Sequence, residues 1–158
     1  MNYRFVAIDS AIAARFRATG RDDGGNELRR LRREVPEPGY PCRHCLRKAR
    51  QGELMLLGSY RLPRPSGIYW NPSPIFVHAE GCERFASTEL PEVLNGPPLS
   101  IRSYDATHQM IYPLSDVRDG KQLKAAIEKS LADPQTSYAN VHTAQFGCFL
   151  CSVERPAS

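Results

Sequence analysis

The stretch PGYPCRHCLRKARQGE, residues 38–53, combines a proline-rich turn, a Cys-x-x-Cys pair that encloses a histidine, and a basic segment. The prolines exclude regular structure at its start, and Pro41 suits the first position of a helix. We therefore expect a short helix over residues 42–50. That helix places Cys42 and Cys45 on one face, because residues three apart share a face.

Outward from this stretch, most of the chain alternates short β-prone runs with turns. Residues 120–132 are the exception, since Leu123, Ile127 and Leu131 form one apolar stripe at helical spacing. The sequence therefore predicts a single α+β domain over residues 1–158, with a mainly antiparallel sheet of about six to eight strands and one principal helix. Residues 27–35 fit either a helix or a basic edge strand.

Composition places the chain among ordinary globular proteins. It has 158 residues, of which 41% are hydrophobic and 24% charged. No apolar run approaches the roughly 20 residues of a membrane span, and the N-terminus lacks the order of features found in a signal peptide. Five cysteines, an odd number, fit poorly with a closed disulfide framework and favour a reducing compartment. We therefore expect a cytoplasmic protein.

Positive charge is concentrated in the first third of the chain. Residues 1–50 carry a net +6, and residues 51–158 carry a net −2. No recognised nucleic-acid-binding motif accompanies this charge, so nucleic-acid binding is not expected. The arginines of residues 27–35 predict either a solvated face or a site for an anionic partner: Arg29, Arg30, Arg32 and Arg33.

A second Cys-x-x-Cys pair, Cys148 and Cys151, lies near the C-terminus. Two such pairs favour zinc, because four thiolates complete its tetrahedral shell. The second pair suits this role less well, since a regular strand directs Cys148 and Cys151 to opposite faces. A bulge or a tight turn is then required, and the two intervening residues include neither glycine nor proline.

Other side chains are substitutes in a metal site with fewer cysteines. They are His78, Cys82 and His142. The alternative is that the cysteines are buried and pack as small hydrophobic residues. In this alternative Cys82 is a half-buried loop thiol and His142 hydrogen-bonds to the backbone.

A reactive thiol is a further hypothesis for the first pair. Cys42 follows Pro41 at the expected helix N-terminus, and His44 and Arg47 lie nearby, which are features that lower a thiol pKa. Cys42 and His44 are therefore the candidate catalytic residues. The orienting base and oxyanion hole of a Cys–His hydrolase are not recognisable from the spacing.

Four blocks along the chain resemble an uncharacterised bacterial family, the domain of unknown function 1203. The blocks are PGYPCRHCLRKARQGELMLL at 38–57, PIFVH at 74–78, IRSYDA at 101–106 and GCFLCSVER at 147–155. The resemblance implies a small single-domain bacterial protein and no particular activity. Three functions remain open: a non-enzymatic binding or structural domain with a cysteine-based zinc site, a thiol-dependent enzyme or redox protein, and an anion-binding protein.

Overall fold

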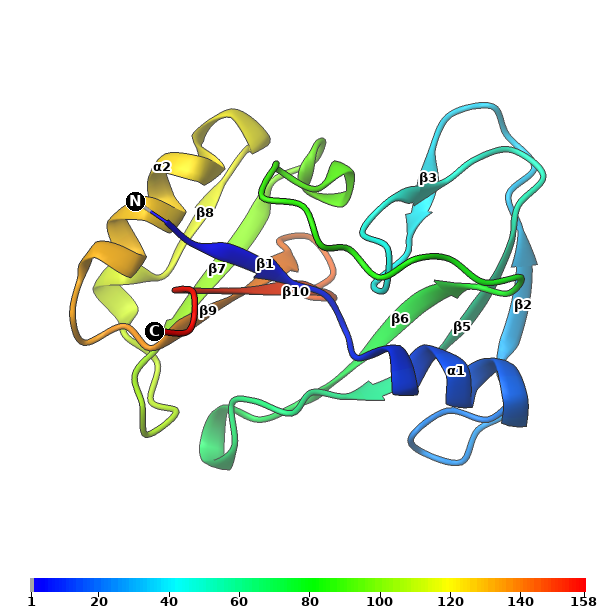
Figure 1. Cartoon of the computed structure of the whole chain (residues 1–158), viewed down its shortest axis with the longest axis horizontal. Coiled ribbons are helices and arrows are strands. Elements are labelled where there is room, and N and C mark those ends of the chain that lie inside the picture. Colours follow the sequence, from blue (N-terminus) through cyan, green and yellow to red (C-terminus); the bar gives the residue numbers. More distant parts are fainter. Residues whose placement is uncertain (1) are drawn as a thin grey trace.

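The computed structural model describes residues 2–158, which form two antiparallel sheets that pack side by side, each with its own apolar core (Figure 1). A small hairpin lies beside them. The strands are β1 (Arg4–Val6), β2 (Arg29–Arg32), β3 (Gly39–Pro41), β4 (Lys48–Ala49), β5 (Leu54–Arg61), β6 (Pro72–His78), β7 (Leu99–Tyr104), β8 (Asp116–Arg118), β9 (Tyr138–Thr143) and β10 (Phe149–Glu154). The α-helices are α1 (Ser10–Thr19) and α2 (Gly120–Ala132), and one-turn 3-10 helices span Gly67–Tyr69, Glu92–Leu94 and Tyr112–Leu114. No helix in this part of the chain is long and apolar enough to cross a membrane.

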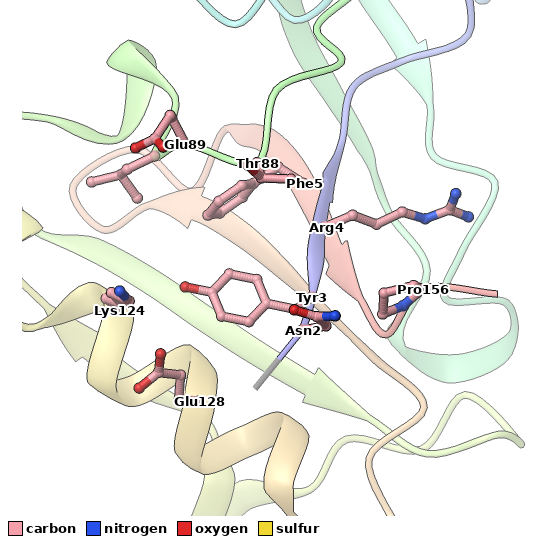
Figure 2. Close-up of a pocket in the computed structure, with 10 residues that line it drawn as sticks. Asn2, Tyr3, Arg4, Phe5, Thr88, Glu89, Lys124, Glu128 and Pro156 are labelled. Carbon is pink, nitrogen blue, oxygen red and sulfur yellow. The ribbon is translucent and has the colours of Figure 1, made fainter. Parts of the chain in front are cut away.

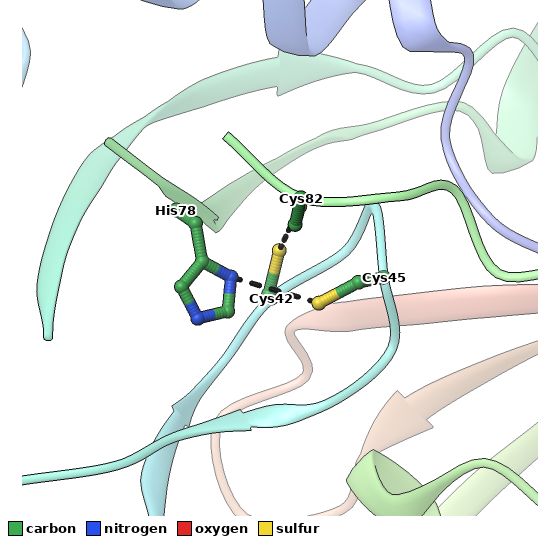
Figure 3. Close-up of side chains that lie close together, drawn as sticks. All are labelled: Cys42, Cys45, His78 and Cys82. Carbon is green, nitrogen blue, oxygen red and sulfur yellow. Dashed lines mark hydrogen bonds between the residues drawn. The ribbon is translucent and has the colours of Figure 1, made fainter. Parts of the chain in front are cut away.

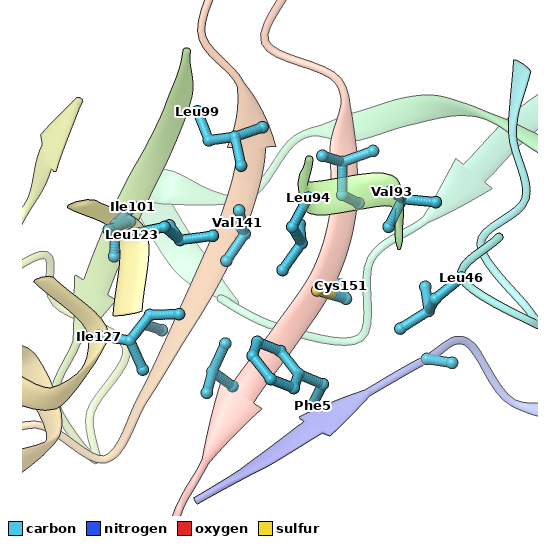
Figure 4. Close-up of a cluster of buried hydrophobic side chains, with 14 of the residues drawn as sticks. Phe5, Leu46, Val93, Leu94, Leu99, Ile101, Leu123, Ile127, Val141 and Cys151 are labelled. Carbon is cyan, nitrogen blue, oxygen red and sulfur yellow. The ribbon is translucent and has the colours of Figure 1, made fainter. Parts of the chain in front are cut away.

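The five-stranded sheet has the order β1-β10-β9-β7-β8, so the first strand pairs with the last. Helix α2 covers one face of it and buries Leu123, Ile127 and Leu131 against the sheet, which confirms the predicted principal helix (Figure 4). The carboxylate of Asp119 accepts hydrogen bonds from the first backbone N–H groups of α2 and fixes where this helix begins.

The three-stranded sheet has the order β2-β5-β6, and α1 packs against it through the fully buried Phe16. Gly58 on β5 leaves room for neighbouring side chains, because a Cβ atom there would lie 3.2 Å from the ring of Phe16 and 2.4 Å from the side chain of Leu28. The ambiguous segment 27–35 contributes β2, an edge strand, rather than a helix.

The prediction of a short helix over residues 42–50 is wrong. Residues 42–47 form the turn of a hairpin between β3 and β4, in which Cys42 N–H donates to Arg47 O and Leu46 N–H to Cys42 O. Leu46 has a φ of 55°, which no α-helix contains. A nine-residue helix is marginal in water, whereas this hairpin turn buries Cys42 and Leu46 completely.

The α+β class is confirmed, with ten strands rather than six to eight. The additional strands have two or three residues, which is too short for an alternating pattern to reveal. Strand β7 pairs with β8 and β9, and the chain around Pro113 forms a 3-10 turn.

Candidate metal centre

Four metal-ligating side chains converge where the hairpin turn meets the end of β6 (Figure 3). Cys42 and Cys45 come from the turn, His78 ends β6, and Cys82 lies in the loop that follows. One ligand atom from each of the four lies within 4.8 Å of all the others. We call these residues the Cys–His group, and it could hold a metal ion.

Backbone hydrogen bonds hold the turn against β6. Arg43 N–H donates to Phe76 O at 2.9 Å, and Cys42 pairs with Phe76 as an isolated parallel bridge. Cys42 is fully buried and His78 is 5% exposed, whereas Cys45 and Cys82 are half-buried. The group is therefore built mostly inside the protein and reaches solvent on one side.

Two separations within the group match a tetrahedral zinc shell. Zn–S bonds of about 2.3 Å and Zn–N bonds of about 2.0 Å place two sulfurs about 3.8 Å apart, and a sulfur and a nitrogen about 3.5 Å apart. The sulfurs of Cys42 and Cys82 are 3.8 Å apart, and Cys45 Sγ lies 3.5 Å from His78 Nδ1.

A carboxylate orients the histidine of the group. Nε2 of His78 forms a short hydrogen bond with Glu53, whose two oxygens accept from the Arg47 guanidinium at 2.8 and 3.0 Å. Arg47 Nη2 also lies 3.2 Å from Nε2, and we assign the Nε2 proton to the bond with the Glu53 carboxylate. With Nε2 held by Glu53, Nδ1 is the atom that would bind a metal ion once its proton is displaced, as in carboxylate–histidine–metal sites.

The cysteines and the histidine of the group shift one another's pKa values. Hydrogen bonds from Cys45 and Cys82 lower the pKa of Cys42, and the bond with Cys42 raises the pKa of Cys45. Hydrogen bonds with Cys42 and Cys82 raise the pKa of His78 to about 10. The Arg47 hydrogen bonds lower the pKa of Glu53 to about 2, so this carboxylate is charged at neutral pH. The metal-free group therefore holds protons that a metal ion would displace.

Donors from outside the group point at the sulfur of Cys82. His44 Nδ1 lies 3.2 Å from this sulfur and Arg17 Nη2 lies 3.5 Å from it. The second nitrogen of His44 contacts the hydroxyl of Ser10 at 2.9 Å, and burial lowers the pKa of His44. His44 thus adjoins the sulfur of Cys82.

The second Cys-x-x-Cys pair lies outside the Cys–His group. Cys151 is fully buried in the core of the five-stranded sheet, where burial raises its pKa to about 12. Cys148 is half-buried in the turn before β10, and its backbone N–H donates to Thr143 Oγ1. The pairing of β9 and β10 shifts between Phe149 and Cys151, so a bulge is present without glycine or proline.

Of the three predicted substitutes, two are in the group and one is not. His78 and Cys82 join Cys42 and Cys45, whereas His142 lies on β9 with Nδ1 2.9 Å from Gly147 O. The sequence carried a signal for this set, namely a Cys-x2-Cys pair followed by His-x3-Cys, the spacing type found in zinc modules.

One surface pocket lies apart from the group. It has a volume of about 700 Å³ and lies between β1, residues 88–90 and α2. Its lining includes the side chains of Tyr3, Lys124 and Glu128 (Figure 2). No cysteine or histidine lines it. Burial and the Glu128 carboxylate raise the pKa of Tyr3 there.

The fold and the Cys–His group together define a small α+β protein with a candidate Cys3His metal centre. Residues 39–155 match the model of the family described as "Protein of unknown function (DUF1203)", and the chain belongs to this family. Neither a curated protein nor a solved structure matches it significantly. The matched range contains the whole Cys–His group.

Proposed function

We propose that this protein is a non-catalytic domain in which the Cys–His group binds one zinc ion. The observation that carries the proposal is the agreement of the S–S and S–N separations with a tetrahedral zinc shell. The Glu53–His78 contact supports it, because it fixes the histidine tautomer that a metal requires.

A structural zinc fits better than a catalytic one. Four protein ligands fill the tetrahedral shell, whereas catalytic zinc sites keep one position for water or substrate. The ligands come from the hairpin turn, the end of β6 and the next loop, so one ion would join three segments. Three zinc-bound thiolates would also favour a reducing compartment, and we propose the cytoplasm as the location of the protein.

The test is to measure metal and thiols on one sample of the full chain, purified without chelator. We expect about one zinc per chain, and three thiols that become reactive when a chelator removes it. Cys151 should react only after unfolding, because it is fully buried in the core. Protein that contains no stoichiometric metal would refute the proposal.

The thiol-dependent enzyme is the alternative for the same residues. It is less well supported, because the side chain of Cys42 is fully buried among the other members of the group. A nucleophile must reach its substrate, so rapid alkylation of Cys42 in the zinc-loaded native protein would favour this alternative over ours.

We also propose that the β2 edge binds an acidic polypeptide. Arg33 N–H donates to Glu53 O, so by antiparallel alternation the backbone groups of Arg30 and Arg32 point away from the sheet. Among residues 2–158, no carboxylate lies within ion-pair distance of the arginines of this strand. An extended acidic chain would pair with the open backbone groups of this edge and with its arginine side chains.

A fluorescent poly-glutamate peptide tests this second proposal. We expect salt-sensitive binding that the double variant Arg30→Glu/Arg32→Glu abolishes, because it reverses the charge at the open edge. Arg61→Glu is the matched control, since Arg61 is exposed at the far end of β5. Equal binding by both variants, or binding unaffected by salt, would exclude the β2 edge.

A further inference from the structure

Two sulfurs of the Cys–His group are in contact but differ in their access to solvent. Cys42 Sγ and Cys82 Sγ are 3.8 Å apart. Cys42 is fully buried on the hairpin turn, whereas Cys82 is half-buried on a loop. A small oxidant therefore reaches Cys82 first and finds a second thiol directly behind it.

We propose that Cys42 and Cys82 form a reversible disulfide when a hydroperoxide oxidises the protein, and that this bond expels the metal. The inference rests on the zinc site proposed above. It adds a modification site and gives the domain a second role, that of a peroxide-responsive metal centre.

The chemistry balances in two steps. The Cys82 thiolate attacks one peroxide oxygen, an S–O bond forms as the O–O bond breaks, and the leaving hydroxide takes a proton to become water. The Cys42 thiolate then attacks the sulfenic sulfur, the S–S bond forms as the S–O bond breaks, and the leaving hydroxide takes a proton from solvent to become a second water. Two thiolates lose two electrons in total, and the peroxide gains them.

The surroundings of Cys82 suit the first step. The Arg17 guanidinium lies 3.5 Å from its sulfur, and its Nε donates to His78 O at 2.9 Å, which fixes the side chain in place. His44 Nδ1 also lies 3.2 Å from the same sulfur. The charged N–H donor of Arg17 beside the sulfur stabilises the negative charge that passes to the leaving oxygen.

The geometry favours Cys82 over Cys45 as the partner of Cys42. The Cys45 sulfur faces His78 Nδ1 at 3.5 Å. Cys42 and Cys45 also share one tight turn, closed by the Leu46 N–H bond to Cys42 O, whereas Cys82 lies on a separate loop that can adjust to disulfide geometry.

Oxidation then removes half of the ligand set. A disulfide sulfur is no longer a thiolate, so only Cys45 and His78 would remain, too few for a structural zinc shell. A dithiol reductant breaks the bond by thiol–disulfide exchange and regenerates all four ligands.

The test treats the zinc-loaded full chain with hydrogen peroxide, follows zinc with a chromogenic chelator, and maps disulfides by mass spectrometry of unreduced digests. We expect one zinc released per disulfide formed, a cross-link between the peptides of Cys42 and Cys82, and recovery of zinc binding after dithiol treatment. A cross-link between Cys42 and Cys45, or zinc retained after complete oxidation, would overturn the inference.

Two matched variants separate the steps without removing a ligand. Arg17→Gln should slow peroxide-driven zinc release by about tenfold while zinc content stays the same, because one charged hydrogen bond to Cys82 is lost. Arg15→Gln, on the same helix and paired with Asp23, should leave the rate unchanged. Equal rates for both variants would exclude Arg17 as a positioning residue.

The starting sample distinguishes the two proposals. Reduced protein without zinc would refute the zinc site, and mapping of the peroxide-treated metal-free chain would still decide whether Cys42 and Cys82 join. Zinc-loaded protein that oxidises at other cysteines would refute only the disulfide.

Discussion

The two Cys-x-x-Cys pairs have identical spacing and different surroundings. Cys42 and Cys45 lie on a tight hairpin turn that directs both sulfurs toward β6. Cys148 precedes β10 and Cys151 lies within it, where the sheet core surrounds the second sulfur. The turn brings Cys42 and Cys45 together with His78 and Cys82, whereas Cys148 and Cys151 belong to no such group among the described residues. Their surroundings, rather than their spacing, therefore make the first pair the candidate for metal binding.

The largest expected difference between the pairs is in metal binding. Cys42→Ser should lose zinc and with it about 4 kcal/mol of unfolding free energy, at free zinc a thousandfold above its Kd. Cys148→Ser should keep both, because Cys148 is outside the Cys–His group. Zinc analysis with urea unfolding at fixed free zinc measures this. Zinc loss in Cys148→Ser would contradict the proposed difference between the two pairs.

The region of the second pair should respond to pH through His142. Burial lowers the pKa of His142 to about 4 from its ordinary 6.5, so between these values the unfolded chain binds one proton more than the folded chain. The unfolding free energy should therefore fall as pH drops from 6.5 to 4, by about 3 kcal/mol in total. His142→Gln should lack this component, which urea titrations of both proteins would resolve. A difference between them that stays constant over this range would contradict the assignment.

Substitution of Cys151 should lower the free energy of unfolding without changing metal binding. Cys151→Ser places a hydroxyl in an apolar core and should cost about 2 kcal/mol of unfolding free energy at unchanged zinc content. Cys151→Ala is the companion variant, since it removes the sulfur without adding a polar group. Urea unfolding gives the free energies, and altered zinc stoichiometry in either variant would assign Cys151 a place in the metal site.

The smallest expected effect concerns Glu53, the carboxylate that contacts His78 beside the first pair. Glu53→Gln should weaken zinc binding by about tenfold, because it replaces the carboxylate that orients His78 with a neutral amide. Glu92→Gln is the matched control, since Glu92 pairs with Arg50 and contacts no member of the Cys–His group. Competition with a chelator of known affinity measures both. Equal affinities would show that Glu53 does not support the metal.

The sequence predicted those elements whose stabilising residues lie close together in the chain. Helix α2 was predictable because its apolar stripe and the Asp119 cap lie within its own residues. The turn at Cys42 was not, because its stability comes from hydrogen bonds with β6, more than thirty residues along the chain. His78 and Cys82 were named only as substitutes, since their approach to Cys42 depends on the pairing of β5 with β6.

The pairing of β1 with β10 has a consequence for the order in which the protein is made. The five-stranded sheet joins Phe5 to Val153, so a ribosome must release almost the whole chain before that sheet is complete. The Cys–His group and the three-stranded sheet lie within residues 29–82, which emerge much earlier. We therefore expect metal capture to precede completion of the larger sheet during synthesis, so that the metal-bound region is already folded when the last strand arrives.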